Sequence, residues 1–145
     1  METLSQILKR EHCSLVVRDV KGNVTLYYKK GVRDLEYLLK QYPDRLKGAE
    51  IADKVIGKAA AAMAVVGGVR SIYAEVMSRK ALPLLQEAGV DFSYGELVDK
   101  IVIAKGDNRC PLENIVEDCQ TAEETVATLQ RHFMEMTLIN NTNRF

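Results

Sequence analysis

The stretch AEIADKVIGKAAAAMAVV, residues 49–66, decides the fold. It contains no proline, and it lies between Gly48 and the pair Gly67-Gly68. Glycines at its ends are typical of helix termination, so we predict one helix over 49–66. Residues 59–66 have no polar side, and a helix that is apolar all round is buried. Its alanines indicate close packing against a neighbouring backbone, as where a helix lies on a sheet.

The segments on either side predict further strands and helices. A capping box at Thr3-Leu4-Ser5-Gln6 begins a short helix that ends near Arg10. Apolar periodicity and turn residues predict the remaining elements: strands over 13–17, 24–28, 69–77 and 90–94, helices over 32–41 and 79–88, and helices that begin at Pro111 and Thr121. Residues 96–105 fit either a helix or a strand.

The order of these elements predicts one three-layer α/β domain. Strand–helix–strand crossovers are right-handed and place helices on both faces of a mixed sheet. We therefore expect a three-layer α/β/α sandwich over residues 1–145, with an N-terminal helix within 1–11 and a frayed tail at 138–145. A chain of 145 residues buries roughly 68–70% of its unfolded surface, which is enough for one core without disulfides.

Composition and charge exclude several classes of function. Lys and Arg number 20, as do Asp and Glu, whereas a general nucleic-acid or membrane-surface binder needs a basic excess. No apolar run reaches the ~18 residues of a membrane span, and the amphipathic start with its acidic residues is not a signal peptide. Three cysteines without paired spacing favour a reducing compartment, so we expect a cytoplasmic protein.

The zero net charge hides an asymmetry between the two halves of the chain. Residues 1–80 carry 15 basic and 9 acidic side chains, a net of +6, whereas residues 81–145 carry 5 and 11, a net of −6. Complementary halves of one domain, or faces that meet in a homo-oligomer, explain this pattern. A basic pocket near the middle of the chain is the alternative, and charge counts alone favour the former.

Motifs for phosphate, dinucleotide and metal binding are absent. Gly57-Lys58 is followed by Ala59, where a P-loop has Ser or Thr, and the upstream glycine of that motif is missing. The chain has no Gly-x-Gly-x-x-Gly and no Cys-x-x-Cys, and the spacing of Cys110 and Cys119 is unusual for zinc. We therefore expect no metal and no cofactor, and any reaction would be independent of metal.

Polar residues at the start of the predicted 49–66 helix form the first candidate site. Lys54 and Lys58 add positive charge to a helix N-terminus, which carries about half a positive charge itself and favours an anionic ligand. Glu50 or Asp53 would orient that ligand or act as acid or base. The alternative is ordinary ion pairing, because Glu50 and Lys54 form a favourable i,i+4 pair. Burial of Lys58 would require a carboxylate or a ligand as its partner.

Cys110, at the N-cap of a helix that begins at Pro111, is the second candidate. Helix N-termini give a thiol more thiolate character, which the negative charge of Glu113 opposes. The sequence shows no base near Cys110, so a small structural thiol is favoured over a nucleophile. Glu113 is better placed as the carboxylate partner of Lys54 or Lys58.

The order of elements resembles the cytidine-deaminase-like fold. In that family, His- or Cys-Ala-Glu opens the buried helix and Pro-Cys-x-x-Cys opens the helix after the next strand. Together they hold the zinc ion that activates water. This chain has Gly48-Ala49-Glu50 at the first place and Ser78-Arg79-Lys80-Ala81-Leu82 at the second, so only Glu50 matches. The resemblance therefore implies a deaminase-like fold without zinc-dependent deamination.

The chain resembles more closely an uncharacterised family, a domain of unknown function, which has the deaminase-like fold without its zinc ligands. The resemblance covers about residues 10–130 and implies no reaction. It rests on the following motifs: Ala52 to Ala61, Ser93-Tyr94-Gly95, Gly106-Asp107, and Cys110-Pro111-x-Glu113 with a later Cys119.

Two hypotheses about function follow. The first is a small-ligand protein, either a binding protein or an enzyme, that binds an anionic, nucleotide-like molecule; the nucleotide rests on fold analogy alone. Its candidate catalytic residues are Asp53, Glu113 and Cys110. Its candidate ligand-binding residues are Glu50, Lys54, Lys58, Ser78 and Tyr94. The alternative is a non-catalytic interaction or scaffold module, which a filled site and an exposed apolar patch would favour.

Overall fold

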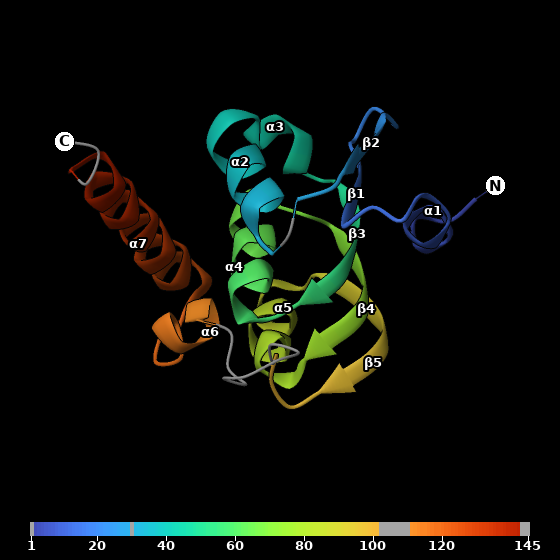
Figure 1. Cartoon of the computed structure of the whole chain (residues 1–145). Coiled ribbons are helices and arrows are strands. Elements are labelled where there is room, and N and C mark those ends of the chain that lie inside the picture. Colours follow the sequence, from blue (N-terminus) through green and yellow to red (C-terminus); the bar gives the residue numbers. More distant parts are fainter. Residues whose placement is uncertain (1, 30, 102–110, 143–145) are drawn as a thin grey trace.

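A five-stranded mixed sheet in the order β2-β1-β3-β4-β5 forms the centre of the computed structural model, which describes residues 2–29, 31–101 and 111–142 (Figure 1). The strands are β1 (Leu15–Arg18), β2 (Val24–Tyr27), β3 (Glu50–Ile56), β4 (Ser71–Ser78) and β5 (Asp91–Val98). β1 is antiparallel to β2 and to β3, whereas β3, β4 and β5 are parallel to one another.

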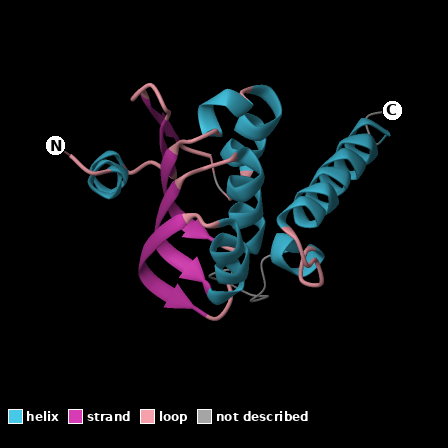
Figure 2. Ribbon diagram, turned by 180° about the vertical axis from the view of Figure 1, so that it is seen from behind, coloured by secondary structure: helices cyan, strands magenta, loops and turns pink. Residues whose placement is uncertain are grey.

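Helices cover both faces of the sheet, as the sequence predicts, with α1 alone on one face and the others opposite (Figure 2). The helices are α1 (Leu4–Glu11), α2 (Arg33–Gln41), α3 (Pro43–Leu46), α4 (Lys58–Gly67), the 3-10 turn η1 (Arg79–Ala81), α5 (Leu82–Ala88), α6 (Pro111–Ile115) and α7 (Ala122–Thr142). We call the face that α1 covers, with Val16 and Ala52, the outer face. The inner face carries Leu15 and Ile51.

The prediction of one helix over 49–66 is wrong, because the first half of this stretch is strand β3 and helix α4 begins only at Lys58. β3 lies in the middle of the sheet, with Ile51 buried toward the inner face and Ala52 toward the outer face. A strand covered on both faces has no clear alternation of polar and apolar residues, so its pattern is easily mistaken for that of a buried helix.

The second half of the stretch confirms its predicted burial. Residues 59–64 of α4 are all at most 3% exposed. α4 contacts the sheet at β3 and also α2, α5, α6 and α7. The alanine side chains let these elements approach the helix backbone closely, so α4 is the centre of the core.

Smaller differences concern element ends. The predicted helix over 79–88 is divided into η1 and α5, and β5 extends to Val98 and so resolves the start of the ambiguous segment as strand. The capping box of α1 is confirmed, since Thr3 and Gln6 exchange both hydrogen bonds. α7 continues to Thr142, so the first residues of the tail predicted from residue 138 belong to this helix.

Candidate functional site

The residues predicted to form one site lie in separate places, because residues 49–66 are a strand and a helix. Lys58, Ser78 and Glu113 lie at or near the carboxyl ends of the parallel strands β3 and β4. Asp53 is buried on the inner face, whereas Lys54 and Tyr94 are exposed. The remaining predicted residues are Glu50, at the amino end of β3, and Cys110, which lies outside the described residues.

Glu113 and Lys58 tie α6 to the start of α4. The two carboxylate oxygens of Glu113 accept hydrogen bonds from the backbone N–H groups of Lys58 (3.1 Å) and Ala59 (3.3 Å). The ammonium of Lys58 donates to the backbone carbonyls of Glu117 (2.9 Å) and Cys119 (2.6 Å). The structure thus brings Glu113 and Lys58 together as predicted, but through the backbone N–H groups rather than the ammonium. A protein carboxylate caps the positive end of α4.

Gly57 makes room for this cap. A Cβ atom at Gly57 would lie 2.8 Å from Cδ of Glu113 and 3.1 Å from Cγ1 of Ile101. Real Cβ atoms do not approach other heavy atoms at 2.8 Å, so any larger residue would displace the carboxylate. The glycine of the Gly57-Lys58 pair, which superficially resembles part of a P-loop, is therefore required by the close packing of Glu113 against it.

Ser78 serves the turn that follows β4. Its hydroxyl accepts a hydrogen bond from the N–H of Lys80 (3.1 Å) and donates one to the carbonyl of Asp99 (3.4 Å). Its predicted N-cap role is confirmed, since it caps η1. The neighbouring ion pairs are Arg79–Asp99 at 3.0 Å and Lys80–Glu117 at 3.5 Å.

Asp53 is a buried carboxyl whose environment favours its neutral form. Its side chain faces the inner side of β3, 6% exposed, and Oδ1 accepts a hydrogen bond from the N–H of Val55 at 3.3 Å. Burial raises the pKa of Asp53 to about 7, against the opposing effect of hydrogen bonds from the N–H groups of Val55 and Lys54, and the charge of Asp34 raises it further. Asp34, buried on α2, accepts a hydrogen bond from the N–H of Lys29 at 2.9 Å.

Glu50 does not pair with Lys54, although the two side chains would be neighbours on a helix. On a strand these two residues are separated by roughly 13 Å, since each residue advances about 3.3 Å. The carboxylate of Glu50 instead lies 2.9 Å from the guanidinium of Arg70 and 3.9 Å from that of Arg18. Both arginines lie on the N-terminal side of the parallel strands, far from the start of α4.

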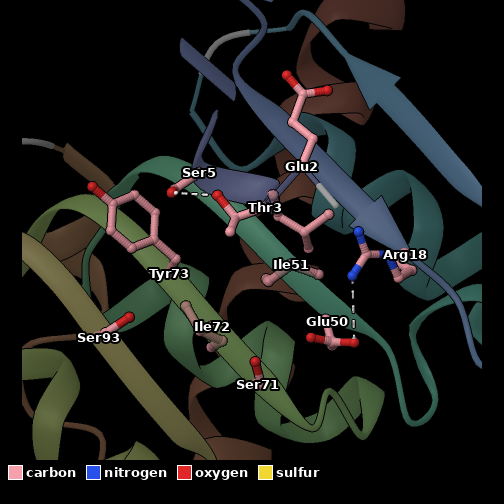
Figure 3. Close-up of a pocket in the computed structure, with 11 residues that line it drawn as sticks. Glu2, Thr3, Ser5, Arg18, Glu50, Ile51, Ser71, Ile72, Tyr73 and Ser93 are labelled. Carbon is pink, nitrogen blue, oxygen red and sulfur yellow. Dashed lines mark hydrogen bonds and ion pairs between the residues drawn. The ribbon is translucent and has the colours of Figure 1, made fainter. Parts of the chain in front are cut away.

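A cavity of about 390 Å³ lies beside Glu50 on the outer face, and the sequence does not predict it (Figure 3). We call it the α1 cavity. Its floor is the amino-terminal half of β3, β4 and β5, and its wall is the start of α1. Its polar lining residues are Glu2, Thr3, Ser5, Arg18, Glu50, Ser71, Tyr73 and Ser93.

The sheet register assembles this floor. Arg18, Glu50 and Ser71 are paired across β1, β3 and β4 in one row. Tyr73 and Ser93 are paired across β4 and β5 in the next row on the same face. Alternate residues of a strand share a face, so Ser71 and Tyr73, two residues apart, lie on the same side of β4. This spacing indicates a polar surface only when the neighbours of β4 in the sheet are known.

The described residues form neither a metal site of acidic, His or Cys side chains nor a membrane-spanning helix. Among residues 2–29, 31–101 and 111–142, no group of three or more His, Cys, Asp or Glu side chains could hold a metal ion. None of the helices in those ranges combines the length and apolar character that a membrane crossing needs.

The comparisons with known proteins place the chain in a family. The family model described as a domain of unknown function, DUF1893, matches residues 3–134. The chain belongs to the DUF1893 family. Nine solved chains match it, among them a DUF1893 family protein (TM1506) from Thermotoga maritima whose crystal structure was determined at 2.70 Å resolution. The two chains are 28% identical, and the match covers 88% of this chain and 86% of that one with a TM-score of 0.78.

The DUF1893 match confirms the predicted resemblance to an uncharacterised family. Among curated proteins, no match is found. The matched range contains every polar residue that lines the α1 cavity except Glu2, and it ends at residue 134, within α7.

Proposed function

We propose that this DUF1893 protein binds a small polar molecule in the α1 cavity. The observation that carries the proposal is a cavity of about 390 Å³ with hydroxyl groups on two sides. Figure 3 shows Ser71, Tyr73 and Ser93 on the strands and Thr3 and Ser5 at the start of α1. A few convergent polar groups in a cavity of this size are typical of sites for small ligands.

The proposal retains the small-ligand class and changes the location of the site. At the start of α4, the groups that would bind an anion already have protein partners: Glu113 accepts from the first backbone N–H groups, and the ammonium of Lys58 is bound to two carbonyls. In the α1 cavity, the hydroxyls of Ser71, Tyr73 and Ser93 have no hydrogen-bond partner within the described ranges. Free polar groups favour the cavity over the helix start.

We propose further that the fold is deaminase-like. The strand order β2-β1-β3-β4-β5, with an antiparallel pair beside three parallel strands, supports this proposal. It carries no reaction to this chain, because function depends on the site and not on the fold. The equivalence that the sequence suggests at Glu50 is wrong, since Glu50 begins a strand rather than the buried helix.

The ligand proposal predicts binding that a bulky side chain in the cavity abolishes. Ribose, uridine, gluconate and ribose 5-phosphate, each at 10 mM, serve as probes of small hydroxylated molecules. We expect at least one to raise the melting temperature saturably, because a ligand at 100 times its Kd stabilises by about 2.7 kcal/mol. Ser71→Leu should remove this shift by filling the cavity.

Thr25→Leu is the matched control, because it adds similar bulk to a strand position outside the cavity. The control should melt with the same ligand-induced shift as the unmodified protein, measured against its own ligand-free melting temperature. Absence of any shift with all four probes, or an unchanged shift in Ser71→Leu, would contradict the proposal.

A second candidate, the interaction module, is favoured by the second half of α7. Its exposed apolar side chains are Met134 (66%), Met136 (44%), Leu138 (60%) and Ile139 (51%). Between Met134 and Ile139 only Glu135 is charged, and the chain as a whole has no net charge, so two copies would repel each other little. We propose a second copy of the chain as the molecule that covers this segment.

The α7 proposal predicts self-association through exposed apolar residues. The weight-average mass, measured by light scattering during size-exclusion chromatography, should rise with concentration toward that of a dimer. Met134→Gln together with Leu138→Gln should restore the monomer mass of 16.3 kDa, whereas Gln130→Ala on the same helix should not. A monomer at all concentrations, with the same mass in all variants, would exclude this interface.

A further inference from the structure

We propose that the ligand of the α1 cavity carries a single oxyanion, a carboxylate or a phosphate, and that Arg18 binds it. This inference rests on the proposed function and specifies the chemical class of the ligand. It follows from three observations: the partners of the charged groups around the cavity, the burial of Arg18, and the position of the free hydroxyls.

The first observation is that no carboxylate holds Arg18 by a hydrogen bond, whereas Arg10 and Arg70 are each held by one. Glu2 is bound by Arg10, with two contacts of 2.7 and 2.8 Å, and Glu50 is bound by Arg70 at 2.9 Å. Among the described residues, the only carboxylate near Arg18 is that of Glu50 at 3.9 Å, beyond hydrogen-bond distance. Of the three guanidiniums around the cavity, that of Arg18 is therefore the one that no carboxylate holds by a hydrogen bond.

The second observation is the partial burial of the Arg18 side chain. The side chain of Arg18 is 24% exposed, compared with 65% for Arg70 and 56% for Arg10. Its five N–H donors have no hydrogen bond to any described residue. These donors are therefore available to a ligand in the cavity, and the planar fork of the guanidinium matches the two oxygens of a carboxylate or phosphate.

The third observation concerns what surrounds the charge. Tyr73 and Ser93 lie in the sheet row next to that of Arg18, roughly 6–7 Å further along the strands, and two and three strands away across the sheet, about 10 and 14 Å at the usual strand spacing. A ligand whose anionic end contacts the long side chain of Arg18 therefore needs a chain of several atoms to bring a hydroxyl group to Tyr73, the nearer of the two. Sugar acids and sugar phosphates have this chemistry.

The acidic residues around the cavity limit the ligand to one anionic group. Glu2 and Glu50 line the cavity, and Asp91, paired with Ser71 on β5, extends the row that begins at Arg18. A polyphosphate would place further negative charge beside these carboxylates, which is unfavourable. Glu50 also competes with the ligand for Arg18. When a ligand binds Arg18, the carboxylate of Glu50 can keep its ion pair with Arg70, which is its closer partner.

The test compares charged and neutral probes by isothermal titration. Gluconate and ribose 5-phosphate represent the carboxylate and the phosphate, and ribose is the neutral probe. We expect at least one anion to bind about tenfold or more tightly than ribose, because hydrogen bonds to charged groups are about twice as strong as neutral ones. The tighter of the two identifies the oxyanion.

Variants at the charged row complete the test. Arg18→Met should weaken binding of the anion at least about tenfold, Arg18→Lys should weaken it less, and Glu50→Gln should strengthen it. Arg131→Met, which removes one positive charge from the exposed surface of α7, is the matched control and should leave binding unchanged. If Arg18→Met does not fold, the role of Arg18 is still tested, because Arg18→Lys should weaken binding of the anion and Glu50→Gln should strengthen it.

The two proposals fail in different ways. If ribose or uridine binds as tightly as the anions, and Ser71→Leu abolishes that binding, the cavity is a ligand site but Arg18 is not its anion anchor. The same conclusion follows if Arg18→Met leaves the affinity for the anion unchanged. If no probe binds the unmodified protein, both proposals are overturned.

Discussion

Replacing Asp53 with asparagine is expected to abolish most of the loss of stability between pH 4 and pH 7. The pKa of Asp53 is raised to about 7 in the folded protein from an ordinary value of 3.8. Between these values the folded state keeps the proton and the unfolded state releases it, so the free energy of unfolding falls as pH rises and levels off above pH 7. About three pKa units correspond to about 4 kcal/mol.

The measurement is urea denaturation at pH 4, 5.5 and 7 for the unmodified protein and for Asp53→Asn. Asp19→Asn is the control with the opposite sign, because hydrogen bonds from the N–H groups of Asn23 and Lys21 lower the pKa of Asp19. Its effect should be confined to the acid end of the range. An unchanged slope in Asp53→Asn would show that this carboxyl is ionised in the fold.

Glu113→Ala is expected to lower the free energy of unfolding by about 1–3 kcal/mol. The substitution removes the acceptor of two N–H groups at the start of α4, and unsatisfied buried donors cost roughly this much. Because Glu113 also holds α6 against α4, the loss should be accompanied by faster hydrogen exchange at the amides of Lys58 and Ala59.

Two further variants make this result specific. Glu123→Ala, on the first turn of α7 and exposed, should leave the exchange of those amides unchanged and should lower the stability less than Glu113→Ala, by about 0.3–1 kcal/mol. Glu113→Gln keeps one carbonyl acceptor and should fall between the unmodified protein and Glu113→Ala. Equal effects of Glu113→Ala and Glu123→Ala would show that the cap contributes nothing measurable.

Local patterns sufficed for the elements whose ends or faces are marked by turn residues, caps or helical spacing. The hairpin β1–β2, helix α2 and the capping box of α1 follow from turn residues, spacing and caps, which are local signals. The stretch 49–66 does not, because β3 is buried on both faces and carries no alternation. Once Asp53 and Lys54 are placed on a strand, their side chains point to opposite faces, so the polar residues predicted to form one site at a helix start no longer lie together.

The candidate site shows the same limit. Opposite charge led the sequence analysis to Glu113 as a partner of Lys54 or Lys58, but it gave no sign that the backbone N–H groups of Lys58 and Ala59 are what Glu113 binds. The α1 cavity could not be predicted, since its lining comes from the start of α1 and from four strands that are far apart in the sequence. Only the sheet register brings Arg18, Ser71 and Ser93 to one surface.

The position of α1 has a thermodynamic consequence. This helix is both the cover of Val16 and Ala52 and one wall of the α1 cavity. A molecule that touches Thr3 and Ser5 therefore gains from a docked α1, and by reciprocity it holds that helix in place with the same free energy. Ligand binding in the cavity and docking of α1 on the sheet are thus thermodynamically linked, so each process favours the other.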